Sequence, residues 1–269
     1  MTEPLKVKTS RDGQVLRWTL ARADRRNAID DRMIDELVEA ASKIPTDSST
    51  RVVLLEGEGT SFCAGADIDS MRQLGECDEQ DNRAAALRMA KLFAALDTLQ
   101  KPLVGRLHGH CFGGGVGLAA VCDIVVAEES CVFSTSEVRL GIIPAVVGPY
   151  LVQKMGLSRC RELILSARRF SCTEAQSFGL VHHVTDKDSL DKVVDTVLND
   201  LLLGGPRAQE HVKSFLRKLG DGDRTREKWA EWTAAEIAHA RASREGQQGL
   251  EAFLNKTPPP WVPEVTNDK

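Results

Sequence analysis

A run of three glycines, Gly113 to Gly115, is the strongest constraint on how this chain folds. It follows an apolar segment, Leu103 to Leu107, that is typical of a strand, and it opens a segment of small apolar residues typical of a buried helix. The first N–H groups of a helix have no acceptor within it, so they stabilise a negative charge. The run lacks the lysine of a phosphate-binding P-loop and the GxGxxG spacing of a dinucleotide fold. Close packing of the helix is the alternative reason for the glycines.

A second loop of small residues lies in SFCAGADIDSM, from Ser61 to Met71. It follows the apolar strand predicted at 51–55, and residues 64–66 leave the backbone N–H groups uncovered. Asp67 and Asp69 then fall in the predicted first turn of a helix, where a carboxylate favours the helix dipole. The segment therefore indicates either a backbone binding loop or a tight turn with a helix cap.

The rest of the chain divides into two compositional parts. Strands and helices alternate in the first half, and from about residue 146 the pattern is almost entirely helical, which predicts an α/β core over residues 1–200 and a helical part over 201–269. The proline run at 258–260 predicts an extended tail. Strands are predicted at 14–20, 51–55, 103–107, 123–127 and 131–134, and helices at 30–44, 81–99, 147–155, 158–167, 173–178, 188–202, 206–219, 224–244 and 247–255.

Composition excludes some classes of protein. The formal charge of −4 gives no general attraction for nucleic acid or anionic membranes, so neither is expected as a partner. The seven cysteines are odd in number and form no CxxC pair, which argues against a disulfide framework or a zinc site. The N-terminus has no secretory signal, and no apolar run reaches the roughly 18 residues of a membrane span. We expect a soluble cytoplasmic protein; a transit peptide removed before residue 1 is the alternative.

Three motifs in order carry a resemblance to a known family. FCAGADIDSM, HGHCFGGGVGLAAVCDIVVA and FSTSEVRLGIIPAVVGPYL, with RRNAID, GLVHHV and the closing EGQQGLEAFLNKTPPPW, resemble the crotonase superfamily of enoyl-CoA hydratases and isomerases. The resemblance implies an α/β spiral of ββα turns with a helical C-terminal trimerisation part, in trimers that often pair into hexamers. It also implies an acyl thioester of coenzyme A as substrate, with no metal and no cofactor beyond that coenzyme.

The resemblance also assigns residues to the site. It implies an oxyanion hole formed by the backbone N–H groups of Ala66 and Gly114, each donor typically worth about 3 to 4 kcal/mol of barrier. It implies contacts of the loop backbone with adenine and pantetheine, and contacts of the C-terminal positions with the coenzyme of a neighbouring subunit. The substrate-binding residues so implied are Ala64, Ala66, Asp67, Ile68, Gly114, Phe253 and Lys256.

One carboxylate of the family pattern is missing. The archetypal hydratases activate water with two glutamates; this sequence carries Glu137 at the second position and Gly117 at the first, which removes an acid and is expected to open space. The wording of the motifs is closest to the methylglutaconyl-CoA hydratase-like branch, which favours a hydratase with Glu137 as its single acid/base. Without the resemblance, a surface glutamate is the alternative. The pocket expected to raise the pKa of Glu137 comprises Val132, Phe133, Val138, Leu140, Ile142 and Ile143.

The sequence leaves the roles of three further candidate side chains undecided. His110 stands where related decarboxylases carry a histidine, and it could bind a distal carboxylate, share proton transfer or simply sit in the core. His108 is a weaker candidate on the same predicted strand face. Arg139 could pair with an acidic acyl tail, with water or with Glu137. The competing functions are a Δ3,Δ2-enoyl-CoA isomerase, an acyl-CoA decarboxylase, and a non-catalytic CoA- or RNA-binding protein.

Overall fold

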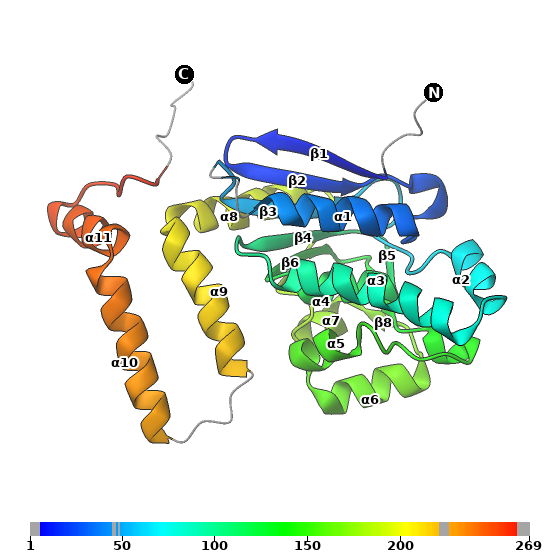
Figure 1. The fold of residues 1–269 in the computed structure, drawn as a ribbon. Coiled ribbons are helices and arrows are strands. Elements are labelled where there is room, and N and C mark those ends of the chain that lie inside the picture. The colour runs from blue at the N-terminus through cyan, green and yellow to red at the C-terminus, as the bar shows by residue number, and fades with distance from the viewer. Residues whose placement is uncertain (1–5, 45–46, 48, 221–225, 263–269) are drawn as a thin grey trace.

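The computed structural model describes residues 6–44, 47, 49–220 and 226–262. A six-stranded sheet in the order β1-β2-β3-β4-β6-β9 forms its centre (Figure 1). β1 pairs antiparallel with β2, and every later pair in this sheet is parallel. The strands are β1 (Val7–Asp12), β2 (Val15–Leu20), β3 (Val52–Gly57), β4 (Leu103–Leu107), β6 (Ile124–Glu128) and β9 (His183–Thr185).

Both faces of the central strands β3, β4 and β6 are buried, which explains the mainly apolar sequences of these strands. On β3, Val52 and Leu54 pack against α8 (Leu190–Leu203), while Val53 and Leu55 join the larger core on the opposite face. That larger core includes α1 (Asp31–Lys43) and α3 (Glu79–Asp97). The alternation places one layer of helices on each side of the sheet.

A second, smaller sheet produces the spiral. It has the order β5-β7-β8, with β5 (His110–Phe112), β7 (Val132–Ser134) and β8 (Phe170–Ser171). Successive turns place one strand in each sheet and then a helix: β4, β5 and α4 (Gly114–Val121), followed by β6, β7 and the 3-10 helix η3 (Glu137–Leu140). The expected α/β spiral of ββα turns is therefore confirmed. The remaining elements of this part are η1 (Ala23–Arg25), α2 (Ile68–Gly75), α5 (Gly148–Met155), α6 (Leu157–Ser166) and α7 (Cys172–Ser177).

The C-terminal helices lie to one side of the spiral (Figure 1). They are α9 (Pro206–Gly220), α10 (Arg226–Ala242) and α11 (Arg244–Asn255). α9 is tied to the core by Lys213, whose ammonium lies 2.5 Å from an Asp123 carboxylate oxygen and 3.0 Å from the Lys101 carbonyl oxygen. Within the described residues, no helix is long and apolar enough to cross a membrane. A domain boundary at residue 200 stays a prediction.

Two details of the C-terminal part differ from the sequence expectations. The helix expected near 224–244 is confirmed as α10, but it ends at Ala242, because Ser243 is extended and caps the separate helix α11; residues 224 and 225 lie outside the described residues. The proline segment is not an extended tail as far as Val262, because the Val262 N–H donates to the Pro259 carbonyl oxygen at 3.1 Å and closes a turn. The Trp261 indole N–H donates to the Leu203 carbonyl oxygen at 3.1 Å, and the Arg51 guanidinium donates to the Trp261 carbonyl oxygen at 3.2 Å.

A third expectation fails at Gly109. His108 and His110 were expected on one strand face, but β4 ends at Leu107 and β5 begins at His110 in the other sheet. Gly109 makes the crossing with φ +60, and a Cβ there would lie 2.0 Å from the Thr60 carbonyl oxygen. This conformation and contact admit only glycine, so the two histidines belong to different environments.

Candidate active site

The two glycine loops meet at a backbone β-bridge between two cysteines, both of which are free thiols. Cys63 and Cys111 form a parallel β-bridge. The Phe112 N–H donates to the Cys63 carbonyl oxygen at 3.0 Å, and the Cys63 N–H donates to the His110 carbonyl oxygen at 3.2 Å. Each loop then runs three residues further, to Ala66 and to Gly114. The register of the bridge therefore brings these two positions to the same level.

Ala66 and Gly114 present their N–H groups at one place. Ile29 holds the outer edge of the first loop: its N–H donates to the Gly65 carbonyl oxygen at 2.7 Å, and its carbonyl oxygen accepts from Asp67 N–H at 2.9 Å. In such a bridge the N–H of the middle residue, Ala66, points away from Ile29. A Cβ built on Gly114 would lie 3.8 Å from the Ala66 nitrogen. Among the described residues, neither N–H has a hydrogen-bond acceptor.

Close approach of backbone explains the glycines beside these two N–H groups. A Cβ on Gly65, whose φ is +99, would lie 3.0 Å from the Phe112 carbonyl oxygen. A Cβ on Gly115 would lie 2.4 Å from the Cys63 carbonyl oxygen. Both glycines allow the two loops to touch, which is their function in the fold. Gly114 is a different case, because its missing side chain leaves the space in front of Ala66 open.

Glu137 faces the start of α4. It is the first residue of η3, and its carboxylate oxygen Oε1 lies 3.2 Å from where a Cβ of Gly113 would be. Its other oxygen, Oε2, is buried and has no hydrogen-bond partner among the described residues. Burial raises the pKa of Glu137 above its ordinary value of 4.5. A half-buried carboxyl of this kind holds its proton more tightly than an exposed one and can act as a general acid or base.

The pocket around Glu137 differs from the expected one. Phe133 is fully buried, but Leu140, Ile142 and Ile143 are 64%, 43% and 73% exposed. Leu140 precedes the left-handed turn at Gly141 and Ile142 and Ile143 follow it, at the exposed end of η3. The sequence predicted that the apolar residues of this segment enclose the carboxylate of Glu137, and the exposure of these three side chains shows that this prediction is wrong.

Gly117 does not open space, contrary to expectation. A Cβ at this position would lie 2.4 Å from Val147 Cγ1 and 2.9 Å from Phe93 Cε1. Val147 is 5% exposed and Phe93 is fully buried. The volume that a larger residue would take at Gly117 is already filled by these two side chains.

The two histidines have separate hydrogen-bond partners. His110 Nδ1 lies 3.3 Å from the hydroxyl of buried Ser61, and its ring packs edge-on against Phe112 at 5.0 Å between centroids. His108 Nε2 lies 2.9 Å from the Gly59 carbonyl oxygen, and burial lowers the pKa of His108. The described contacts bring neither ring to Glu137, so a catalytic role for His110 stays a prediction.

Three further candidates can be placed. Arg139 is exposed, and within the described part of the chain it forms no ion pair with Glu137. Cys63 and Cys111 are fully buried, and burial raises the pKa of the Cys63 thiol to about 12. Both thiols are therefore protonated and inert as nucleophiles. No cluster of three metal-ligating side chains occurs in the described ranges.

Sequence reasoning missed Arg22, which holds the first loop in place. Its guanidinium donates to an Asp67 carboxylate oxygen at 2.9 Å and lies 3.2 Å from an oxygen of Asp30. Asp67 is the N-cap of α2 and accepts from Asp69 N–H and Ser70 N–H. Burial raises the pKa of Asp67, but hydrogen bonds from Ser70 and Arg22 outweigh it and bring the pKa below its ordinary value. Asp67 is thus a structural carboxylate, and nothing local in the sequence marks Arg22 as its partner.

The two C-terminal candidates lie far along the chain on α11. Phe253 is 80% exposed, and Lys256 caps the end of the helix in a left-handed conformation with φ 55. No described contact links either residue to the loops at Ala66 and Gly114. Their contact with the coenzyme of a neighbouring subunit stays a prediction.

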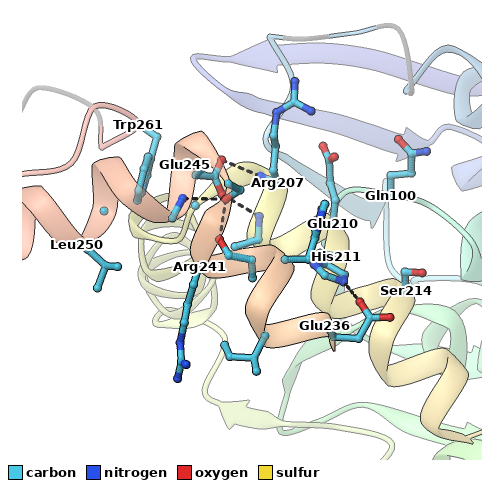
Figure 2. A pocket seen from close by; sticks show the side chains of 18 of the residues that line it. Gln100, Arg207, Glu210, His211, Ser214, Glu236, Arg241, Glu245, Leu250 and Trp261 are labelled. Atoms are coloured by element: carbon cyan, nitrogen blue, oxygen red, sulfur yellow. Dashed lines mark hydrogen bonds and ion pairs between the residues drawn. The ribbon is translucent and has the colours of Figure 1, made fainter. Parts of the chain in front are cut away.

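A cavity of about 1040 Å³ separates the C-terminal helices from one another (Figure 2). Its walls come from α9, α10 and α11, and from Thr98 and Gln100 of the core. Glu245 crosses it to accept from the N–H groups of Arg207 and Ala208 at 3.0 and 2.8 Å, which caps α9. His211 of α9 bonds Glu236 of α10. None of the residues predicted for catalysis lines this cavity.

Comparisons with known proteins agree with this geometry. The model of the enoyl-CoA hydratase/isomerase family matches residues 10–264. An enoyl-CoA hydratase of Alternaria alternata is 34% identical over 80% of this chain and 70% of its own. The 2,3-dehydroadipyl-CoA hydratase of Escherichia coli is 30% identical over 93% of this chain and 96% of its own. The crystal structure of an enoyl-CoA hydratase from Shewanella pealeana has a TM-score of 0.91 at 35% identity, covering 95% of this chain and 96% of that one.

Proposed function

This chain belongs to the enoyl-CoA hydratase/isomerase family, and we propose that it hydrates its substrate with one carboxylate, Glu137, and two backbone N–H groups. The activity is that of an enoyl-CoA hydratase, which adds water across the double bond of a 2-enoyl-CoA thioester. The observation that carries the assignment of the site is the pair of unoccupied N–H groups of Ala66 and Gly114 beside a buried carboxylate.

In the proposed mechanism, the thioester carbonyl oxygen accepts hydrogen bonds from Ala66 and Gly114. Glu137 orients a water molecule and takes its proton as the water oxygen attacks Cβ. The electron pair of the double bond moves onto the thioester oxygen, where the two N–H groups stabilise the enolate. Glu137 then returns the proton to Cα, so the product contains one added water and the enzyme is regenerated. No metal and no cofactor takes part in this sequence.

The substrate range remains part of the proposal. We propose a branched or dicarboxylic 2-enoyl-CoA, such as 3-methylglutaconyl-CoA, because the residues of the three motifs resemble those of the methylglutaconyl-CoA hydratase-like branch. The similarity to 2,3-dehydroadipyl-CoA hydratase supports a dicarboxylic acyl group. Arg139 is a candidate for the distal carboxylate because it is exposed and has no ion pair among the described residues. The odd number of cysteines without CxxC spacing supports a reducing, cytoplasmic setting.

We further propose that the enzyme works as a trimer, or as a hexamer of two trimers. The support is the exposure of Leu250, Phe253 and Leu254 on α11, at 51%, 80% and 78%. Large apolar side chains that are exposed together mark interaction surfaces. A second copy packed on α11 would bring Phe253 and Lys256 to its own bound coenzyme. Light scattering after size-exclusion chromatography tests this, and a monomer would contradict it.

Product mass tests the assigned chemistry. Wild type and Glu137→Gln are incubated with crotonyl-CoA, a 3-enoyl-CoA and 3-methylglutaconyl-CoA, and the products are identified by mass spectrometry. We expect a product heavier by one water, which is lost in Glu137→Gln. A product of unchanged mass but altered retention would indicate an isomerase, and loss of carbon dioxide a decarboxylase using His110. No turnover of any substrate, with binding retained, would favour a non-catalytic coenzyme A- or RNA-binding protein.

A further inference from the structure

The side chain of Val147 takes the place that a second carboxylate would need. Gly117 is buried in α4, and a Cβ there would lie 2.4 Å from Val147 Cγ1, with Phe93 Cε1 and Cζ at 2.9 and 3.0 Å. Valine is branched at Cβ and stiff at χ1, so its methyl group cannot swing aside easily. The ring of Phe93 is fully buried and packs against Tyr150 at 5.9 Å between centroids.

This place lies next to Glu137. Gly113 and Gly117 are one helical turn apart, and the Gly117 N–H donates to the Gly113 carbonyl oxygen at 3.2 Å. Gly113 is the N-cap of α4 with φ +48, so it precedes the helix, and Gly117 lies one turn further along. Since Glu137 Oε1 is 3.2 Å from the Cβ position of Gly113, a side chain at Gly117 would begin one helical turn from the carboxylate. The methyl group of Val147 stands there instead.

We propose that Val147, supported by Phe93, is a positioning residue that keeps this wall of the site apolar and leaves Glu137 as the single carboxylate that the described residues place at the reacting centre. The inference rests on the proposed function, because it assigns a role relative to Glu137. Val147 excludes both a second acid at Gly117 and the water that an open space there would hold. The attacking water is then oriented by Glu137 alone.

The apolar wall affects the pKa of Glu137, because it keeps a second carboxylate and water away from it. Two carboxylates in one site perturb each other, because like charges at short range raise the pKa of one of them. A single carboxylate in a partly dry pocket avoids this coupling. Among the described residues, burial raises the pKa of Glu137, its own backbone N–H lowers it, and no other charged group contributes. Removing the methyl groups of Val147 should therefore wet the pocket and lower the pKa of Glu137.

An alanine cycle tests the steric part. We compare melting temperatures of wild type, Gly117→Ala, Val147→Ala and the double variant. Gly117→Ala should lower the melting temperature because its Cβ meets Val147 Cγ1 at 2.4 Å. In the double variant that contact is gone, so the two effects should not add and part of the loss should be recovered. Additive effects would overturn the proposal.

Kinetics with crotonyl-CoA test the positioning part. Val147→Ala should lower kcat on the order of tenfold, because the attacking water is less well placed. It should also move the acidic limb of the kcat profile toward pH 4.5, the ordinary pKa of a glutamate. The matched control is Val197→Ala on α8, where valine is 7% exposed in the other core cluster. The control should lose stability without changing the profile. An unchanged profile in Val147→Ala would overturn the proposal.

A pair of double variants distinguishes a failure of this inference from a failure of the proposed function on which it rests. Gly117→Glu combined with Val147→Ala should introduce the second carboxylate and add a second ionisation to the pH–rate profile, whereas Gly117→Gln with Val147→Ala should not. If the glutamate and glutamine variants have the same profile, residue 117 does not face Glu137 and the inference is wrong. If Glu137→Gln retains full activity, the proposed function is wrong, whatever the alanine cycle shows.

Discussion

Cys63 and Cys111 lie opposite each other in a parallel bridge, and this one pair sets the spacing of the two N–H groups at the site. Each loop advances three residues beyond the bridge, so Ala66 and Gly114 arrive side by side. The spacing depends on backbone register, and the ion pair of Arg22 with Asp67 holds the first loop in place beside it. Burial of both cysteines keeps the bridge dry and the backbone geometry fixed.

Gly114→Ala should damage catalysis and leave the fold intact. Its Cβ would lie 3.8 Å from the Ala66 nitrogen, in the space proposed for the thioester oxygen, and 3.1 Å from the terminal methyl group of Ile29. We expect kcat for crotonyl-CoA to fall by about 10- to 100-fold, which is less than the ~10²–10³ cost of losing one oxyanion donor, because alanine keeps its N–H and only crowds the oxygen. Gly148→Ala is the control, because a Cβ there has nothing within 4 Å. Equal activity of both variants would exclude this space as the oxyanion site.

The sequence predicted the α-helices and five of the strands, but it missed β1, β5, β8 and β9 and predicted the partners of the elements poorly. The glycine run at Gly113 and the loop at Gly65 each indicated uncovered backbone, because local sequence fixes strand, turn and helix start. The pairing of these loops depends on the bridge between Cys63 and Cys111, which joins residues 48 positions apart. Such a contact leaves no local pattern, so only the resemblance predicted it.

Local sequence patterns also do not predict which distant side chain fills the space beside a given residue. Gly117 suggested an open site, because a glycine in sequence shows only a missing side chain. The structure places Val147 over it, and that residue comes from the next turn of the spiral. Arg22 was missed for the same reason: its partner Asp67 is 45 residues away. Residues that are distant in the sequence and pack on a site can be identified only from the three-dimensional structure.

The pKa of Glu137 should govern the acidic limb of the activity profile. A general base must be ionised, and burial raises the pKa of Glu137 above 4.5, so kcat/KM should fall with a midpoint above pH 4.5 as the solution is acidified. The folded state also binds this proton more tightly than the unfolded chain does. The carboxyl therefore destabilises the fold above its folded pKa, and this effect vanishes below pH 4.5.

Glu137→Gln should accordingly melt at or above the temperature of wild type at pH 8, and the difference should shrink as the pH is lowered toward 4.5. Thermal melts over this range measure it, with kcat/KM recorded on the same wild-type samples. A wild-type acidic limb centred at or below pH 4.5 would mean that the carboxyl is solvated during turnover. That result would contradict the buried position of Oε2.

Lys256 should affect coenzyme binding and not chemistry. The residue has φ 55, so Lys256→Asn removes the charge with a residue that tolerates this conformation. A single exposed ion pair is worth ~0.2–1 kcal/mol, so KM for crotonyl-CoA should rise by roughly up to fivefold with kcat unchanged. The increase should disappear at high salt. Lys256→Arg should behave as wild type, and a fall in kcat without a change in KM would contradict the assignment.

His182 should make the fold sensitive to acid between pH 6.5 and 4. Its Nδ1 accepts a hydrogen bond from the Val125 N–H at 2.9 Å, which requires a neutral ring. Burial and nearby Lys154 lower the pKa of His182 from 6.5 to about 4. The unfolded chain thus takes up this proton first, so stability present above pH 6.5 is lost progressively as the pH falls toward 4.

His182→Asn tests this source of acid sensitivity, because its side-chain oxygen can accept the same N–H without titrating. Urea unfolding at pH 7.5 and 5.0 should show a smaller loss of unfolding free energy in the variant than in wild type. His183→Asn is the matched control, since the side chain of His183, the next residue along the chain, has no hydrogen bond to Val125 within the described residues. An equal loss in wild type and His182→Asn would assign the acid sensitivity to other groups, such as His108, whose pKa is also lowered by burial.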